Sequence, residues 1–353
     1  MKHLKKYIAK SAHPVLTADA HSVILCIDNM HNISRASDCR GRRCFKNERK
    51  RKMLTVDCSM QNGETVETAL CEVRGLSKAY KSFQLKNVKF RLEPGYIMGF
   101  VGRNGAGKST TIKSMLRLVK PDGGEVKMFG MDYAENEEEC KRRLGIVLGE
   151  FDYYADKRLK TVTGVVKRFY PEWDGAAYKR CIERFDLDEL KRVKELSAGM
   201  RVKYALALAL SHNARLLILD EPTSGLDPVS RDELLDLFRE FVSDGTKSIL
   251  FSTHITSDLD KCADYIMYIK DGSIVMSGDR EEIIGGYRIV GGGKADLTPE
   301  LENALIGIKE TPFGFTGLIS EKDLYVADGL RTAPADIESI MLYTEKYEIH
   351  QEA

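Results

Sequence analysis

The sequence predicts an α/β fold in which a largely buried sheet carries a glycine-rich loop. Three features of the chain from Cys71 onward support this prediction. Short apolar runs such as YIMGFV, LGIVL, RLLILD, SILF and YIMYI alternate with helical patterns, as they do in sheets that are covered on both faces. A glycine-rich segment ending in Gly-Lys-Ser follows one apolar run, and an Asp-Glu pair ends another.

The helical patterns follow the apolar runs in a regular order. We expect helices after Gly107, over 136–144, over 161–185, from 197 to 212 and from 228 to 244. The last region opens with GGYRIVGGG, whose glycines predict a linker. It continues with a helix-like TPELENALI, a strand–turn pattern at GFTGLISEKDLYVADG and a helix-like PADIESIMLYTE. The predicted parts are an extension (1–65), a main domain (66–285) with a small helical subdomain at about 151–200, and a C-terminal α+β extension (286–353).

The composition indicates a folded protein that does not cross a membrane by itself. The 353 residues are 43% hydrophobic and 30% charged, which is ordinary for soluble domains. No apolar run approaches the roughly 18 residues that a membrane-spanning helix needs, and the run SVILCI is too short for a secretory signal. Eight cysteines form no dense disulfide framework in a chain of this length, so we expect a cytoplasmic protein.

The first 59 residues differ in charge from the rest. They contain 13 Lys or Arg and 5 Asp or Glu, whereas the remainder contains 41 and 48. We expect residues 1–65 to be a disordered basic extension, and translation from Met53 or Met60 is the alternative. The run RGRRCFKNERKRK also suits anionic lipid or nucleic acid. A zinc site here would have poorly spaced ligands, among them Cys39, Cys44 and Cys58.

The glycine-rich segment, residues 102–109, matches the pattern GxxxxGK[ST] between an apolar strand and a helix-forming run. We call it the phosphate loop. Gly102, Gly105 and Gly107 let the backbone curl so that its N–H groups point at phosphate oxygens, and the following helix adds its positive end. Lys108 is predicted to reach the β- and γ-phosphates, and the Ser109 hydroxyl to bind Mg²⁺.

The segment RLLILDEPTSGLDP supplies the carboxylates that hydrolysis needs. Residues 216–219 form a buried strand that delivers Asp220 to the phosphate end of the sheet, where it can hold Mg²⁺. Glu221 follows directly. Because side chains alternate along an extended strand, we expect Glu221 to face the attacking water as general base.

These segments resemble the nucleotide-binding domains of ATP-binding cassette (ABC) proteins, over roughly residues 70–279. The segment ELSAGMR, residues 195–201, resembles the family's signature motif. The resemblance implies that Ser197 and Gly199 grip the γ-phosphate bound by the opposite subunit. Ser197 is also a good helix N-cap, and the two roles are compatible because an exposed helix N-terminus binds anions.

Three further positions match the family's pattern. Residues 224–227, ending in Asp227, resemble the D-loop that links the two sites of a dimer, and His254 resembles the switch histidine that contacts the γ-phosphate. Tyr80 stands where the family stacks an aromatic ring on adenine. The resemblance therefore implies ATP and Mg²⁺ as ligands. The implied nucleotide-binding residues are Tyr80, Gly102, Asn104, Gly105, Ala106, Gly107, Lys108, Ser109, Thr110, Ser197, Gly199 and Asp227.

Two departures from the family pattern stand out. The signature segment has Ala198 where a second glycine is commonest and Met200 where glutamine is commonest, as in exporter-type cassettes. After the run LGIVL the chain has Gly149 and Glu150 in place of the glutamine that normally bridges Mg²⁺ and the membrane subunit. We expect Glu150 to be a metal ligand in its place.

The chain contains a single cassette, whereas a complete site needs the signature of a second one. The resemblance implies a head-to-tail dimer with a copy of itself or with a related chain. It also implies separate transmembrane permease subunits, on the inner face of the cell membrane, and no nucleic acid partner. The tail and the signature segment resemble the YtrB-type branch of Gram-positive cassettes, so the expected function is the ATPase subunit of a bacterial exporter.

Two other classes of function fit parts of the sequence. A non-transport ABC ATPase acting in translation or DNA repair usually carries two cassettes or a long coiled coil, and this chain has neither. A P-loop kinase or GTPase would have no use for the signature segment.

Overall fold

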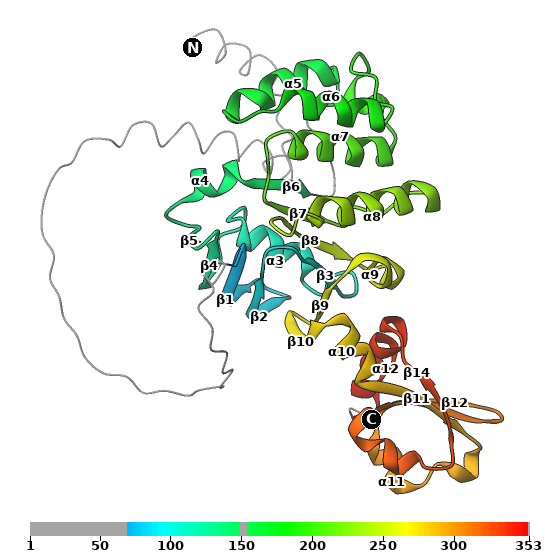
Figure 1. The fold of residues 1–353 in the computed structure, drawn as a ribbon. Coiled ribbons are helices and arrows are strands. Elements are labelled where there is room, and N and C mark those ends of the chain that lie inside the picture. Colours follow the sequence, from blue (N-terminus) through cyan, green and yellow to red (C-terminus); the bar gives the residue numbers. More distant parts are fainter. Residues whose placement is uncertain (1–68, 149–153, 352–353) are drawn as a thin grey trace, which may run out of the picture. The chain divides into compact units, whose positions relative to one another are not determined.

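The computed structural model describes residues 69–148 and 154–351. They are organised around a six-stranded sheet and two four-stranded sheets (Figure 1). The predicted fold class is confirmed. The predicted boundaries after residues 65 and 285 stay predictions, and Glu150, Cys39, Cys44 and Cys58 lie outside the described residues.

The six-stranded sheet has the order β10-β9-β3-β8-β7-β6. All its neighbouring strands are parallel except β10 and β9. Most of its residues are buried, as the apolar runs predicted. Because the carboxyl ends of parallel strands lie at one edge, the segments that follow β3, β7 and β8 meet there. The strands are β3 (Ile97–Val101), β6 (Leu144–Leu148), β7 (Leu216–Asp220), β8 (Ser248–Thr253), β9 (Tyr265–Lys270) and β10 (Ser273–Asp279).

Alternating side chains of this sheet enter two separate cores. On one face, Ile249 and Phe251 pack with residues of α7, α8 and α9. On the other, Leu250 packs with residues of α3 and of an antiparallel sheet with the order β2-β1-β4-β5. These strands are β1 (Cys71–Ala79), β2 (Gln84–Leu92), β4 (Gly123–Met128) and β5 (Met131–Asp132). The helices are α3 (Lys108–Met115), α4 (Glu137–Arg142), α7 (Ala198–Leu210), α8 (Pro228–Val242), α9 (Thr256–Cys262) and α10 (Arg280–Gly285).

A third core joins α7 to the small helical region, where α5, α6 and α7 lie together (Figure 1). The elements are α5 (Leu159–Val166), η3 (Lys167–Phe169), α6 (Gly175–Arg184) and η4 (Val193–Glu195). The helical stretch predicted over 161–185 is therefore divided into α5, η3 and α6. The helix is interrupted because Pro171 has no backbone N–H to donate. Asp174 then caps α6 by accepting hydrogen bonds from the N–H groups of Ala176 and Ala177.

The C-terminal region is an antiparallel sheet with the order β12-β13-β11-β14, covered by short helices. The linker predicted at GGYRIVGGG is wrong, because these residues form β11, which pairs with β13 on one side and β14 on the other. That prediction gave more weight to the glycines than to the apolar residues of YRIV. The elements are β11 (Tyr287–Gly292), η5 (Lys294–Asp296), α11 (Pro299–Ala304), β12 (Leu305–Thr311), β13 (Gly314–Ser320), η6 (Glu321–Ala327), β14 (Arg331–Pro334) and α12 (Ile337–Gln351).

The last helix attaches this region to the main domain. Ile337, Ile340 and Tyr343 of α12 belong to the same core as α8 and α9, and the Tyr268 hydroxyl donates to Glu345 at 2.5 Å. Within the described residues, no helix is both long and apolar enough to span a bilayer.

Candidate functional site

The phosphate loop joins β3 to α3 in a conformation that requires glycine. Gly105 and Gly107 have φ values of +85° and +118°, which glycine adopts without the strain that other residues incur. A Cβ on Gly107 would lie 2.8 Å from Cζ of Phe83, and one on Gly102 would lie 2.4 Å from the carbonyl oxygen of Ile269. The loop therefore has no space for side chains at two of the three predicted glycines.

Lys108 is the first residue of α3 and its side chain is buried. Its Nζ donates to the carbonyl oxygen of Gly102 at 2.7 Å and lies 3.0 Å from Oε1 of Glu221. A buried ammonium group requires such partners because it has lost its hydration. Ser109 and Thr110 follow in the first turn of α3, whose unpaired N–H groups form a site for anions.

Asp220 and Glu221 leave the end of β7 in different directions. Asp220 is buried, and its Oδ1 accepts a hydrogen bond of 2.5 Å from the Ser252 hydroxyl. Glu221 has a φ of +51°, so the chain has already left the extended conformation. The two carboxylates diverge as predicted, but the cause is this turn and not alternation along the strand.

The Glu221 carboxylate joins three segments of the chain. Its Oε1 contacts Lys108, and its Oε2 lies 2.7 Å from Nδ1 of His254, which follows β8. Glu221 is partly accessible, with 21% of its side chain exposed, and His254 is more so, with 41%. A carboxylate held in this way can accept a proton from a water molecule placed beside a terminal phosphate.

Two residues close to the site were missed by the sequence analysis. Ser252 holds both carboxylate residues, because its hydroxyl donates to Asp220 and accepts from the N–H of Glu221 at 2.9 Å. Phe83 adjoins Gly107, and its ring centroid lies 6.5 Å from that of Tyr80. Tyr80 is 47% exposed, so its ring is accessible to a flat ligand next to the phosphate loop. A second aromatic residue three positions after Tyr80 was the signal for Phe83.

A helix begins within the signature segment, and another begins directly after the D-loop; each has a capping side chain. Ser197 accepts a hydrogen bond from the N–H of Met200 at 3.2 Å, which confirms its predicted capping role. Asp227 caps α8 by accepting from the N–H groups of Val229 and Ser230. The hydrogen bond from Ser230 is the main reason that the pKa of Asp227 is lowered.

No hydrogen bond or ion pair within residues 69–148 and 154–351 joins Ser197, Gly199 or Asp227 to Lys108 or Glu221. Ser197 and Asp227 are exposed, whereas Lys108 is buried. The chain therefore brings together the phosphate loop, the Asp-Glu pair and His254, and it leaves the signature segment and the D-loop available to another chain.

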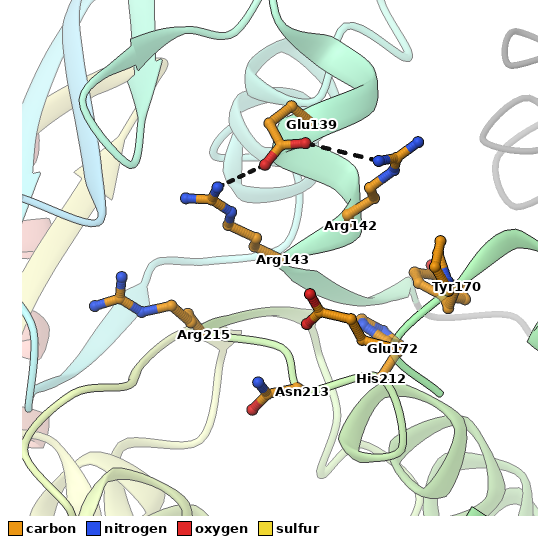
Figure 2. Close-up of a pocket in the computed structure, with 9 residues that line it drawn as sticks. Glu139, Arg142, Arg143, Tyr170, Glu172, His212, Asn213 and Arg215 are labelled. Carbon is orange, nitrogen blue, oxygen red and sulfur yellow. Dashed lines mark hydrogen bonds and ion pairs between the residues drawn. The ribbon is translucent and has the colours of Figure 1, made fainter. Parts of the chain in front are cut away.

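A hollow of about 460 Å³ lies at the edge of the six-stranded sheet that is opposite to the phosphate loop. It is lined by residues that directly precede β6 and β7, among them Arg143 and Arg215, and by Tyr170 of the helical region. Figure 2 shows the Glu139 carboxylate between the guanidinium groups of Arg142 and Arg143. The ring of His212 stacks on that of Tyr170, with the ring centroids 3.9 Å apart. This contact connects the end of α7 to the segment between η3 and α6.

His212 makes the stability of this connection depend on pH. Burial lowers its pKa from 6.5 to about 4. Between these values the unfolded chain binds a proton that the folded chain excludes, so the stability falls as the pH is lowered from 6.5 towards 4. At pH 5 the loss amounts to about 2 kcal/mol. We expect His212→Phe, which keeps the stacked ring, to show a smaller drop in Tm between pH 7 and pH 5 than the wild type does. Equal drops in circular-dichroism melts would contradict this assignment.

The glycine loop, the buried Lys108 and the strand ending in Asp220 and Glu221 define a P-loop nucleotide-hydrolysing domain. Comparisons with known proteins agree. The family model described as "ABC transporter" matches residues 85–224. The ATP-binding protein YtrB of Bacillus subtilis is 29% identical over 219 residues, covering 62% of this chain and 75% of that protein.

The bacitracin transport ATP-binding protein BcrA of Bacillus licheniformis is 31% identical over 211 residues, covering 59% of this chain and 69% of that protein. A solved structure of an ATP-binding subunit of an ABC transporter is 28% identical with a TM-score of 0.56, and the match covers 61% of this chain and 91% of that one. The chain belongs to the ATP-binding proteins of ABC transporters, which are ATPases. The alternative functions in translation or DNA repair find no support in these relatives.

Proposed function

We propose that Lys108, Asp220, Glu221 and His254 form the half of an ATPase site that one chain contributes. The Lys108 ammonium binds the β- and γ-phosphates, Glu221 takes a proton from the attacking water, and His254 orients Glu221 and contacts the γ-phosphate. The observation that carries this proposal is the position of the Glu221 carboxylate, with Lys108 at 3.0 Å and His254 at 2.7 Å. These contacts fix the position of the Glu221 carboxylate before the reaction begins.

The oxygen atoms near the phosphate loop suit Mg²⁺. Asp220 accepts the hydrogen bond from Ser252 with its Oδ1, which leaves its Oδ2 for a metal ion. Together with the Ser109 hydroxyl this oxygen is a hard ligand of the type that Mg²⁺ prefers, and the remaining ligands would be phosphate and water. When bound, Mg²⁺ would neutralise charge on the phosphates. The predicted ligand Glu150 remains a proposal.

We also propose that the complete site forms between two cassettes. Ser197 and Gly199 of one chain would contact the γ-phosphate held by the phosphate loop of the other, with Asp227 at the same interface, and Tyr80 would stack on the adenine. The exposure of Ser197 and Asp227 supports this arrangement. The partner cassette is a second copy or a related chain.

In this scheme ATP binding closes the dimer and hydrolysis opens it, and the movement is passed to separate transmembrane permease subunits. The protein would then work at the inner face of the cell membrane. The likeness of the signature segment to exporter-type cassettes favours export as the direction. The helical region from α5 to α7, which has its own hydrophobic core, would contact the permease.

Mixing two inactive variants tests the shared site. Ser197→Arg blocks the signature segment, whereas Lys108→Ala disables the phosphate loop, so each homodimer lacks both sites. A mixed dimer regains one intact site, built from Lys108 of the first variant and Ser197 of the second. We expect each variant alone to hydrolyse ATP at background rate, and an equimolar mixture to recover up to about one quarter of the wild-type rate if subunits pair at random.

Ser197→Arg alone should still bind ATP as tightly as the wild type, because its own phosphate loop is intact. Two batches of Ser197→Arg mixed together provide the control for handling and dilution. A mixture of the two different variants that stays at background in both hydrolysis and ATP-dependent dimer formation would count against a site shared between copies of this chain.

A further inference from the structure

Asp258 is a buried carboxylate in α9 that contacts the segments carrying Glu221 and His254. Only 1% of its side chain is exposed. Its Oδ2 accepts a hydrogen bond from the Thr223 hydroxyl at 2.7 Å and a weaker one from the Thr253 hydroxyl at 3.4 Å. Thr223 is two residues after Glu221, and Thr253 directly precedes His254. One oxygen atom therefore links the two segments.

The other carboxylate oxygen faces a third segment. Nε of Arg231 lies 3.8 Å from Oδ1 of Asp258, which is too far for a hydrogen bond but close enough for a strong electrostatic attraction in a buried site. Arg231 is in the first turn of α8. Its backbone N–H donates to the backbone carbonyl oxygen of Asp227 at 3.0 Å. Asp258 is thus connected to the segments of Glu221, His254 and Asp227.

The attraction to Arg231 does not by itself account for a buried carboxylate at this position. Burying a charge is costly, and replacing buried ion pairs by well-packed apolar residues is often neutral or stabilising. Thr223 and Thr253 are both fully buried, so an apolar residue at position 258 would leave their hydroxyl groups without this acceptor. Only an acceptor with several lone pairs can join two hydroxyl donors at one point.

We infer that Asp258 is a positioning residue that holds the Glu221 and His254 segments in a fixed relation during ATP turnover. It acts through the hydroxyl groups of Thr223 and Thr253. The inference rests on the roles proposed above for Glu221 and His254. A small displacement of a base from its reacting partner is sufficient to slow a reaction by up to about 100-fold.

The test compares Thr223→Val, which removes the hydroxyl and keeps the shape, with Thr223→Ser, which keeps the hydroxyl, and with Asp258→Leu, which removes the acceptor. We expect kcat to fall by about 10- to 100-fold in Thr223→Val and in Asp258→Leu. KM for ATP should stay within about twofold, because the phosphate loop is unchanged. Thr223→Ser should restore kcat. The Thr223→Val/Asp258→Leu double variant should be no slower than the slower single variant, because both remove the same link.

Thr163→Val is a matched control. It removes another buried threonine hydroxyl, one that contacts Tyr178 and Tyr204 at 2.8 Å in the helical region. We expect it to lower the free energy of unfolding without changing kcat per folded molecule, with the folded fraction measured by circular dichroism.

Three results would overturn the inference: a wild-type kcat in Thr223→Val, an equal loss in Thr223→Ser, or a rise in KM that matches the fall in kcat. If Asp258→Leu does not fold, the two Thr223 variants decide the question. Failure of the proposed role of Glu221 is recognised separately, because Glu221→Gln would then turn over ATP normally.

Discussion

Replacing Glu221 by glutamine is expected to lower ATP turnover by about 10²- to 10⁴-fold, the usual contribution of a positioned general base. The amide keeps the size of the carboxylate and a hydrogen bond to His254, but it cannot accept the proton of the attacking water. Lys108 keeps its hydrogen bond to the carbonyl oxygen of Gly102, so ATP should still bind. We therefore expect Glu221→Gln to accumulate as an ATP-bound dimer.

Phosphate release measures the rate of this variant, and size-exclusion chromatography with and without ATP measures the dimer. Glu183→Gln is a suitable control, since Glu183 is an exposed residue of α6 whose carboxylate lies 3.8 Å from Nζ of Lys179. Turnover near the wild-type rate in Glu221→Gln, with no ATP-bound dimer, would remove the basis of the proposed mechanism.

Replacing Lys108 by alanine is expected to weaken ATP binding by about 10- to 100-fold and to abolish measurable hydrolysis. A hydrogen bond to a charged group contributes about 1.5–3 kcal/mol, and Lys108 is the buried cation at the phosphate loop. The variant also loses the ion pair with Glu221, so that carboxylate would keep His254 as its remaining partner among the described residues.

Isothermal titration calorimetry with ATP measures the affinity of Lys108→Ala, and circular dichroism confirms that it remains folded. The matched control is Lys113→Ala, in the last turn of the same helix. We expect Lys113→Ala to bind ATP like the wild type. If Lys108→Ala also bound ATP with unchanged affinity, the phosphate loop could not have the role proposed for it.

Local patterns in the sequence predicted the conformation of the phosphate loop. The spacing of Gly102, Gly107 and Lys108 defines a loop whose conformation depends on a few consecutive residues, and the structure has the positive φ angles and close backbone contacts that this requires. The buried strand ending in Asp220 was also predicted, because a run of apolar residues bounded by charged residues indicates a covered parallel strand.

Predictions based on composition were less successful. The glycines of GGYRIVGGG suggested a linker, yet β11 pairs on both sides within a sheet. Glycine lowers the preference for a strand only modestly, and hydrogen bonds to β13 and β14 outweigh that preference. The helix predicted over 161–185 likewise neglected Pro171 and the capping residue Asp174.

The sequence by itself determined the α/β class, the phosphate loop and the Asp-Glu pair, because each depends on neighbouring residues and their local conformation. Only the tertiary structure decided that Ser252 holds Asp220 and that Asp258 connects Thr223 with Thr253. Those contacts depend on the alignment of β7 with β8, in which Asp220 lies opposite Ser252, and on the packing of α9 against them. Hydrogen bonds between side chains more than 30 residues apart form only after the strands are aligned, so no local pattern in the chain predicts them.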